Sequence, residues 1–364
     1  MTASGFWPLL AAPLFNSIAL LLALGFRRNR TVIVLAILTL ASLALAGVVA
    51  PEQGARGTDA ARMFAPWLLL AAAAMPERRL LARRNLILLL LLAIAVWLTL
   101  AAPAHVWPGL RKALPFGLLP WSGGAVAAML TFIAAGLCLL RWVLRGSPLE
   151  AGLSIVLALA GFALLPAMSP DSARYAFALA GVGALSAILY ASYRMAFVDA
   201  LAGLPNRRAL DEALARQSGD YALAMVDVDH FKQFNDTHGH DAGDRVLRSV
   251  AQQLRSVRGG SAYRYGGEEF CLLFTGARMH GAKQACEDVR KRVEQLRVHV
   301  RSAPAKPRRG QATKRIDASD VQVTVSIGLA ERDAQRRFAE DVLKAADTAL
   351  YKAKSKGRNR VVVG

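Results

Sequence analysis

Hydrophobic residues are distributed differently in the two parts of the chain. Residues 1–198 consist mainly of long apolar runs, whereas residues 199–364 alternate short apolar runs with charged segments. Because a bilayer core needs about 20 apolar residues per helix, the first part is predicted to be a multi-pass helical membrane domain. Seven spans are expected, near residues 6–26, 31–50, 63–76, 86–107, 123–144, 152–168 and 174–196; the third is short.

Basic residues predict the orientation of these spans. Four groups follow the first, third, fifth and seventh spans: Arg27, Arg28 and Arg30; Arg78, Arg79, Arg83 and Arg84; Arg141 and Arg145; and Arg194. With seven spans all four groups lie on one side, whereas six spans would scatter them over both faces. That side should be the cytoplasm, which puts the N-terminus outside. The opposite face is also basic, with Arg56, Arg62, Arg111 and Lys112.

The second part, residues 199–364, has the pattern of one soluble α+β domain. Strands are expected at Tyr221–Val226, Ala262–Arg264, Phe270–Phe274, Val321–Ala330 and Val361–Val363. Helices are expected near 230–236, 241–257, 279–298 and 339–355. The order of these elements predicts a βαββαβ core with its helices on one face of the sheet.

Charge does not make this chain a nucleic-acid-binding protein. Residues 1–198 contain 15 Lys and Arg against 5 Asp and Glu, and residues 199–364 contain 30 against 21. About half of the net charge of +19 therefore belongs to the membrane part, where positive-inside placement explains it. The basic stretch 301–315 is either a solvated loop or a loop that touches anionic lipid headgroups.

The positions of the cysteines and the start of the first apolar run argue against disulfides and against a cleaved signal peptide. Cys138 lies in a predicted span, and Cys271 and Cys286 lie in the domain expected in the cytoplasm, so no disulfide is expected. No basic residue precedes the first apolar run, so no cleaved signal peptide is predicted.

The segment Arg264-Tyr265-Gly266-Gly267-Glu268-Glu269-Phe270 predicts a hairpin with acidic residues at its tip. Glycine accepts a positive φ at little steric cost, so Gly266 and Gly267 permit a tight reversal. The adjacent carboxylates of Glu268 and Glu269 can bind a divalent metal. Taken alone, a charged hairpin tip is more often an ordinary solvated turn.

A second acidic group, in Asp227-Val228-Asp229-His230-Phe231-Lys232, directly follows an apolar strand. Asp229 can be the cap of the next helix, but Asp227 falls at the strand end itself. If the hairpin lies beside this strand, Asp227 and Glu268 reach a common cation. Two divalent ions held there would clamp a nucleotide triphosphate.

Two polar segments add candidate nucleotide contacts, each with a purely structural alternative. Asn235 and Asp244 bound a polar turn between helices; an Asp carboxylate can accept from N1–H and the 2-amino group of guanine, but such residues also suit turns. Lys354 and Arg358 lie four residues apart near a helix end at Gly357. They can bind phosphate or simply complement the helix dipole.

Together these segments resemble a GGDEF domain, the catalytic domain of diguanylate cyclases, in its GGEEF variant. The resemblance covers residues 199–364 and rests on Asp199–Arg208, Asp227–Lys232, Asn235-Asp236, Gly243-Asp244, Arg264–Phe270, Val325–Gly328 and Ala346–Val361. It implies a βαββαβ core related to polymerase palms and class III nucleotide cyclases. It does not cover residues 1–198, which are expected to be sensory or regulatory.

The resemblance also implies roles for individual residues. Asp227, the carbonyl of Val228 and Glu268 would bind metal. Glu268 would be the base for the ribose 3′-OH, Glu269 would support the metal pair and Arg264 would help with phosphate charge. The implied nucleotide contacts are Asn235 and Asp244 for guanine, Lys232, Lys354 and Arg358 for the triphosphate, the backbone at Gly266 and Gly267, and Phe231.

The implied reaction joins two GTP molecules into cyclic di-GMP with release of two pyrophosphates. It requires two Mg²⁺ per half-site, with Mn²⁺ as a substitute, and a homodimer in which each domain binds one GTP. Together with the predicted spans, the resemblance gives the expectation of a multi-pass protein of the bacterial inner membrane, with the catalytic domain in the cytoplasm, the lipid bilayer as a further partner and no nucleic acid polymer. There are two alternatives: a binding module without turnover, and a membrane transporter or receptor with an accessory domain.

Two positions depart from the family pattern. Ala202 stands where the family usually has Thr, at a structural position. Product-inhibited members carry Arg-x-x-Asp before the hairpin, whereas here Arg258 is followed by no Asp at that distance. Weak or absent product inhibition at that site is therefore predicted.

Overall fold

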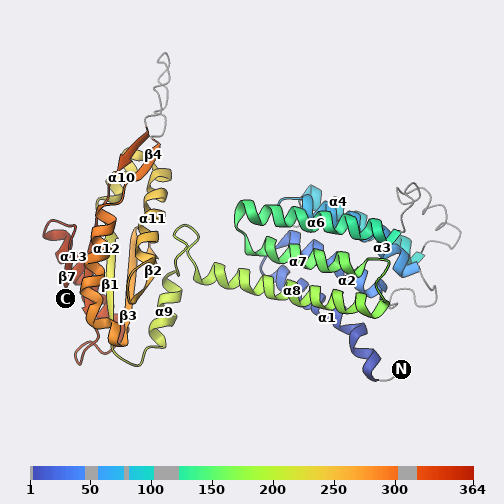
Figure 1. Ribbon diagram of the computed structural model, residues 1–364, viewed down its shortest axis with the longest axis horizontal. Helices are drawn as coiled ribbons and strands as arrows, with labels where there is room; N and C mark the ends of the chain where they lie inside the picture. Colours follow the sequence, from blue (N-terminus) through green and yellow to red (C-terminus); the bar gives the residue numbers. More distant parts are fainter. Residues whose placement is uncertain (1–2, 46–55, 78–81, 102–122, 302–317) are drawn as a thin grey trace, which may run out of the picture. The chain divides into compact units, whose positions relative to one another are not determined.

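The chain divides into two compact units, Met1–Ser192 and Tyr193–Gly364. A computed structural model describes residues 3–45, 56–77, 82–101, 123–301 and 318–364 (Figure 1). The division falls within helix α8, a few residues before the domain boundary expected at residue 199. Each unit is described below by itself.

The regular elements of the first unit are all helices among its described residues, and a helix occurs at each expected span. The helices are α1 (Ala3–Gly25), α2 (Asn29–Leu45), α3 (Arg56–Ala74), α4 (Arg83–Ala101), α6 (Gly123–Arg145), α7 (Pro148–Ala163) and α8 (Pro170–Phe197). Parts of the expected spans 31–50 and 86–107 lie outside the described residues. Among the described helices, Gly124–Arg145 and Asp171–Phe197 are long and apolar enough to cross a membrane, with mean hydropathies of 2.0 and 1.6. The multi-pass topology stays a prediction.

Arginine side chains tie the helices of this unit together at one end. Arg30, at the start of α2 and only 4% exposed, forms an ion pair with Glu150 of α7. Its backbone N–H donates to Glu77 Oε1 at 3.1 Å. Arg141 of α6 donates to the carbonyl oxygens of Ala73 and Ala74, at the end of α3. These arginines therefore satisfy carbonyl and carboxylate groups that water would otherwise solvate.

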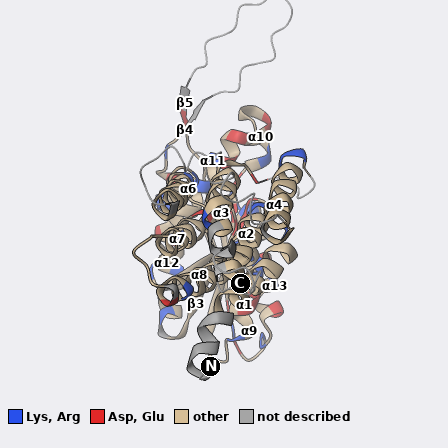
Figure 2. Ribbon diagram, turned by 90° about the vertical axis from the view of Figure 1, so that its right-hand side faces the viewer, with Lys and Arg blue, Asp and Glu red and all other residues tan. Residues whose placement is uncertain are grey.

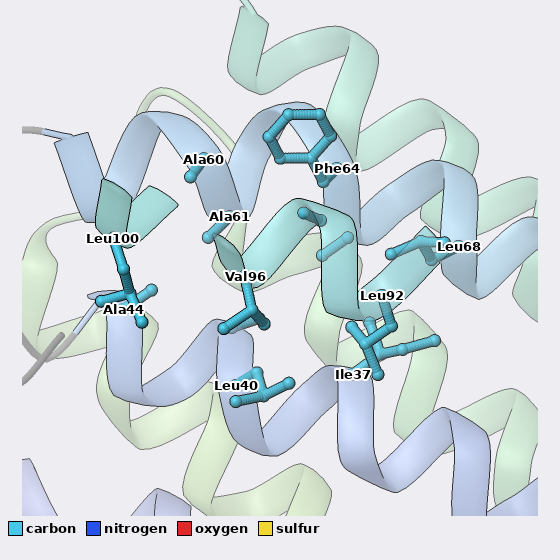
Figure 3. A pocket seen from close by; sticks show the side chains of 13 residues that line it. Ile37, Leu40, Ala44, Ala60, Ala61, Phe64, Leu68, Leu92, Val96 and Leu100 are labelled. Carbon is cyan, nitrogen blue, oxygen red and sulfur yellow. The ribbon is translucent and has the colours of Figure 1, made fainter. Parts of the chain in front are cut away.

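Helices α2, α3 and α4 enclose an apolar pocket of about 360 Å³ (Figure 3). Alanines such as Ala41, Ala61 and Ala95 leave the space, and larger side chains such as Phe64 and Leu92 bound it. Every lining side chain is a hydrocarbon, so the pocket offers no side-chain partner to a polar group.

The second unit is built on a five-stranded sheet in the order β2-β3-β1-β6-β7. The strands are β1 (Tyr221–Val228), β2 (Gly260–Gly266), β3 (Glu269–Thr275), β6 (Val325–Glu331) and β7 (Val361–Val363). Central β1 pairs antiparallel with β3 and β6, and β6 pairs parallel with β7. All eight residues of β1 are buried, so both faces of the sheet are covered at its centre.

Helices pack on both faces of this sheet, and the prediction of a single helical face was wrong. Helices α10 (Phe231–His238), α11 (His240–Arg255) and α12 (Ala282–Glu294) share one core with Ala222, Ala224 and Val226. Helices α9 (Arg207–Ala215) and α13 (Ala339–Ser355) share a second core with Tyr221, Leu223 and Met225. The cause is the continuous apolar run of β1, which is typical of a strand buried on both sides.

Several expected boundaries also differ from the structure. The single strand Val321–Ala330 is two strands, because β5 (Ala318–Val321) pairs with β4 (Val298–Arg301) in a separate small sheet. The helix expected near 279–298 is a 3₁₀ segment, η3 (Gly276–Gly281), followed by the shorter α12. Most of the basic stretch 301–315 lies outside the described residues.

The packing of α13 on β6 gives a test of the fold. A Cβ atom at Gly328 would lie 2.1 Å from the Leu350 nitrogen and 2.2 Å from the Ala346 carbonyl oxygen, both backbone atoms of α13. Gly328→Ala is therefore expected to destabilise this unit by about 3 kcal/mol, which lowers its Tm by roughly 6–12 °C. Calorimetry on the full chain measures this. Gly219→Ala, where a Cβ meets open space, is the control; equal Tm values for both variants would contradict the packing.

Candidate active site

The β2–β3 hairpin brings acidic residues to the end of the central strand. Asp227 lies opposite Glu269 in the β1–β3 register, and the Val228 N–H donates to the Glu268 carbonyl oxygen at 3.4 Å. Gly267 has a φ of +36°, and no atom lies within 4 Å of a Cβ built there or on Gly266. The hairpin tip is therefore open to the approach of a ligand, as the glycines predict.

A lysine near the C-terminal end of the chain partly neutralises this acidic group. Lys354 Nζ of α13 lies 2.8 Å from Asp227 Oδ2, and Asp227 is only 4% exposed. Burial raises the pKa of Asp227, against the lowering effect of Lys354. The pKa values of Glu268 and Glu269 are also raised, first by burial and then by the charge of Asp227. Like charges gathered in this way favour the binding of a further cation.

A hollow of about 380 Å³ opens at this point. Seven residues named from the sequence line it: Asp227, Val228, Phe231, Lys232, Glu268, Lys354 and Arg358. Three residues to which the sequence analysis assigned no role, His230, Gln233 and Asp236, line it as well. All three lie within one turn of named residues, so helical spacing along α10 is the signal that could have found them. Helix α10 presents charges of both signs here (Figure 2).

The residues around the hollow fit a divalent metal of the Mg²⁺ type. Asp227 and Glu268 offer carboxylate oxygens, and Val228 offers a backbone carbonyl oxygen. Within the described part of the chain no three His, Cys, Asp or Glu side chains gather into a complete metal cage. Two carboxylates are nevertheless typical of Mg²⁺ sites, in which water and phosphate oxygens complete the coordination.

Asn235 of α10 approaches Gly243 of α11, the residue before Asp244, but neither Asn235 nor Asp244 is among the residues that line the hollow. A Cβ at Gly243 would lie 1.9 Å from Asn235 Oδ1, so only glycine allows this close approach. Asn235 Oδ1 is buried without a hydrogen-bond partner among the described residues. Unpaired buried polar atoms are uncommon and often mark functional sites.

Arg264 does not lie with the residues that line the hollow. Its Nη1 is 2.6 Å from Asp199 Oδ1, and its Nη2 donates to the Gly267 carbonyl oxygen at 2.7 Å. The expected contribution of Arg264 to phosphate charge is not supported by this position, because the guanidinium is already paired. It instead ties the hairpin tip to the segment that follows α8. Glu269, although beside Asp227, is also absent from the lining.

Asp229 is not a helix cap, and that interpretation was wrong. His230, with a φ of +56°, is the N-cap residue of α10. Asp229 is 6% exposed and accepts hydrogen bonds from Thr324 Oγ1 at 2.6 Å and Ser326 Oγ at 2.7 Å. Its Oδ2 also accepts from the Asn359 N–H at 3.1 Å. Asp229 therefore holds the ends of β1, β6 and the C-terminal turn together.

Helix α13 ends before Arg358, so Lys354 and Arg358 do not share a helix face. The Arg358 N–H donates to Ala353 O at 3.0 Å and the Gly357 N–H to Lys354 O at 3.4 Å, which is a Schellman C-cap with Gly357 at a φ of +103°. Both side chains still line the hollow, because the turn directs Arg358 back toward it.

Comparison with known proteins agrees with this geometry. Residues 196–360 match the family model described as "Diguanylate cyclase, GGDEF domain". The diguanylate cyclase VdcA of Vibrio cholerae is 40% identical over 172 residues, which are 46% of this chain and 47% of that protein. The response regulator PleD of Caulobacter vibrioides is 38% identical over 180 residues, 47% of this chain and 37% of PleD. This chain thus spans less than half the length of these curated relatives.

Among solved structures, the coiled coil and GGDEF domain of DgcB from Caulobacter crescentus, in complex with c-di-GMP, is 35% identical. The match covers 53% of this chain and 98% of that one, with a TM-score of 0.42. Residues 196–360 are thus similar in sequence to the GGDEF domain of diguanylate cyclases.

The burial and crowding of carboxylates predict a pH-dependent cost to stability. Because the pKa of Glu269 is raised in the folded protein, the contribution of this group to stability is complete below its unfolded pKa. That contribution is lost as the pH rises through the folded pKa, so at pH 7 the ionised carboxylate opposes folding. In EDTA at pH 7, Glu269→Gln should raise the Tm of this unit by roughly 1–3 °C.

The difference in Tm between wild type and Glu269→Gln should disappear as the pH falls below the unfolded pKa of Glu269, where both side chains become neutral. Thermal unfolding of the full chain between pH 7 and pH 4 measures it. A lower Tm for Glu269→Gln at pH 7 would show that the carboxylate stabilises the fold and would refute the charge crowding.

Proposed function

We propose that this protein is an active diguanylate cyclase, which condenses two GTP molecules into cyclic di-GMP and two pyrophosphates. The convergence of Asp227, Glu268, Lys354 and Arg358 on one hollow, within the segment that matches the GGDEF family model, carries this proposal. The relative VdcA, named a diguanylate cyclase, supports the same activity.

Each side chain at the hollow has a proposed role in this reaction. Asp227, the Val228 carbonyl and Glu268 would hold Mg²⁺ or Mn²⁺, two ions per half-site. When bound, the metal would lower the pKa of the attacking hydroxyl and neutralise phosphate charge. Glu268 would accept the proton of the ribose 3′-OH, and the adjacent Glu269 would support the same pair of metal ions.

Basic and polar residues around the acids would bind the nucleotide itself. Lys232, Lys354 and Arg358 would hold the triphosphate, since all three line the hollow. Phe231 would pack against the nucleotide, and the open backbone at Gly266 and Gly267 would let it approach the hairpin. The guanine edge would be read by Asn235 and Asp244, beyond the lining residues.

The product sets a requirement on assembly. Cyclic di-GMP contains two equivalent phosphodiester bonds, and one hollow of this size would bind one GTP. Two catalytic domains must therefore face each other so that each 3′-OH attacks the other nucleotide in line. We propose a homodimer, in the bacterial inner membrane, with residues 1–198 as a multi-pass regulatory domain and the N-terminus outside.

The activity is tested on the full chain in detergent micelles with Mg²⁺ and GTP. Wild type should release cyclic di-GMP and pyrophosphate in a ratio of one to two. Glu268→Gln should reduce turnover by about 10²–10⁴-fold, the range typical of a lost general base. Glu340→Gln, which removes an exposed carboxylate of α13, is the matched control and should leave turnover unchanged.

Two results would contradict the proposed function. GTP binding by wild type without cyclic di-GMP would indicate a binding module. Robust cyclic di-GMP from Glu268→Gln would refute the assignment of the base and metal ligand.

Guanine recognition has a separate test at Gly243. An Ala Cβ there would displace the Asn235 carboxamide, which lies 1.9 Å from that position. Gly243→Ala should raise the KM for GTP by at least about tenfold and reduce the preference for GTP over ATP, because a buried polar contact to the base is lost. Steady-state kinetics measures both.

The control for Gly243→Ala is Gly281→Ala, since a Cβ at Gly281 meets nothing within 4 Å. Unchanged KM and unchanged nucleotide preference in Gly243→Ala would exclude Asn235 from base recognition.

A further inference from the structure

The turn that carries Arg358 has an unusual backbone. Gly357, Arg358 and Asn359 have consecutive positive φ values of 103°, 62° and 45°. Glycine adopts this region freely, but a side chain such as that of arginine does so at a cost and only where the surroundings enforce it. The conformation of Arg358 therefore needs an anchor on the C-terminal side of Gly357.

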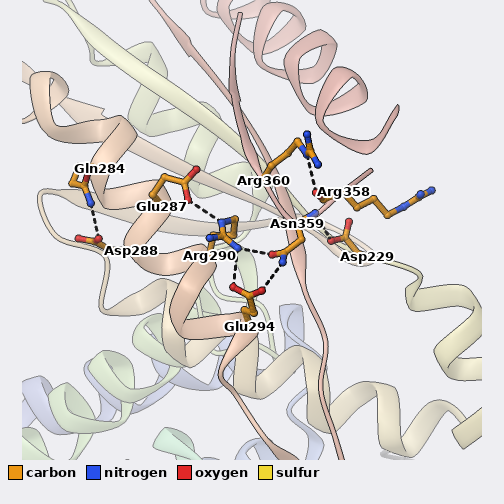
Figure 4. A network of polar contacts seen from close by, with 9 residues as sticks. All are labelled: Asp229, Gln284, Glu287, Asp288, Arg290, Glu294, Arg358, Asn359 and Arg360. Atoms are coloured by element: carbon orange, nitrogen blue, oxygen red, sulfur yellow. Dashed lines mark hydrogen bonds and ion pairs between the residues drawn. The ribbon is translucent and has the colours of Figure 1, made fainter. Parts of the chain in front are cut away.

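Asn359 supplies that anchor through every polar group of its side chain (Figure 4). Its Nδ2 donates to Glu294 Oε1 at 2.8 Å, and its Oδ1 accepts from Arg290 Nη1 at 2.8 Å. Because one partner is an acceptor and the other a donor, the carboxamide has a single satisfactory orientation. The backbone N–H of Asn359 donates separately to Asp229 Oδ2 at 3.1 Å.

The partners of Asn359 on α12 are also held in place by contacts that do not involve the turn. Arg290 also binds Glu287 at 2.8 Å and Glu294 at 2.9 Å, and its side chain is only 12% exposed. Neighbouring Val289 and Val293 are fully buried in the core against the sheet. Helix α12 thus offers a rigid donor–acceptor pair to which the turn is fastened.

The other side of the turn faces the candidate active site. Arg358 lines the hollow together with Asp227 and Lys354. Asp229, which the Asn359 N–H contacts, lies two residues after Asp227 and holds the end of β6 through Ser326. Asn359 itself does not line the hollow. Asn359 therefore connects α12 to the site through two neighbours, Arg358 and Asp229.

We propose that Asn359 is a positioning residue for the phosphate-binding end of the site. By fastening the turn to Glu294 and Arg290, it holds Arg358 in the left-handed conformation that directs its guanidinium toward the nucleotide phosphates. The identity of the ligand as a nucleotide triphosphate rests on the proposed function. The positioning of Arg358 toward a polyphosphate does not depend on turnover.

The test separates the side chain of Asn359 from its backbone. Asn359→Gly keeps the N–H to Asp229 and accepts a positive φ, so it removes only the link to α12. Binding of tripolyphosphate with Mg²⁺ to the full chain in detergent, followed by calorimetry, should weaken about tenfold. The KM for GTP should rise by a similar factor, with a smaller change in kcat.

Non-additivity distinguishes positioning from a general effect on stability. In an Arg358→Ala background, Asn359→Gly should cause no further loss of tripolyphosphate binding, because it acts through Arg358. Asn359→Asp should weaken binding, since two carboxylates then face each other, and Glu294→Gln in the same chain should restore it. Gln284→Ala, which breaks the exposed Gln284–Asp288 hydrogen bond on the same helix, is the control and should change nothing.

Three results would overturn this inference: unchanged tripolyphosphate binding in Asn359→Gly, losses that add fully to those of Arg358→Ala, or no binding by wild type. If Asn359→Gly does not fold, Glu294→Ala removes one of the two bonds that link Asn359 to α12, the bond from Asn359 Nδ2, and is subject to the same criteria. Wild type that binds tripolyphosphate as described but makes no cyclic di-GMP would refute the proposed function and leave the positioning role supported.

Discussion

The C-terminal unit depends on a buried carboxylate at the end of its central strand. Asp227 is 4% exposed because β1 lies between two strands and two helical layers, and such a charge needs a nearby partner. Lys354 provides this partner: its Nζ lies 2.8 Å from Asp227 Oδ2. Lys354 belongs to α13, near the C-terminal end of the chain. The hairpin then adds Glu268 and Glu269 to the same point, which leaves the site short of positive charge.

A second set of contacts, outside the hollow, holds these residues in place. Asp229 joins the ends of β1 and β6 to the C-terminal turn, and Asn359 joins that turn to α12. On the other side, Arg264 fastens the hairpin tip to Asp199, just after α8. The acidic residues and the residues that would bind phosphate are thus placed by hydrogen bonds and ion pairs outside the hollow, in addition to the strands that carry them.

Local sequence patterns predicted most of the elements and several residues of the site, but not the long-range contacts that these residues make. Asp227 after an apolar strand and Glu268 after two glycines were found because strand ends and glycine turns have local signatures. Helix α9 was missed, although Asn206 has the residue type of its N-cap. The ion pair of Arg264 and the contacts of Asp229 join residues 65 to 130 positions apart, and no local pattern encodes such contacts.

The location of a bound metal tests the account most directly. The full chain, with Mn²⁺ and a non-hydrolysable GTP analogue, would be examined by anomalous X-ray diffraction. The account predicts Mn²⁺ in contact with the oxygens of Asp227, Val228 and Glu268, with Lys354 Nζ moved from Asp227 to a phosphate. Mn²⁺ bound elsewhere, or nucleotide bound while Lys354 keeps its ion pair with Asp227, would contradict it.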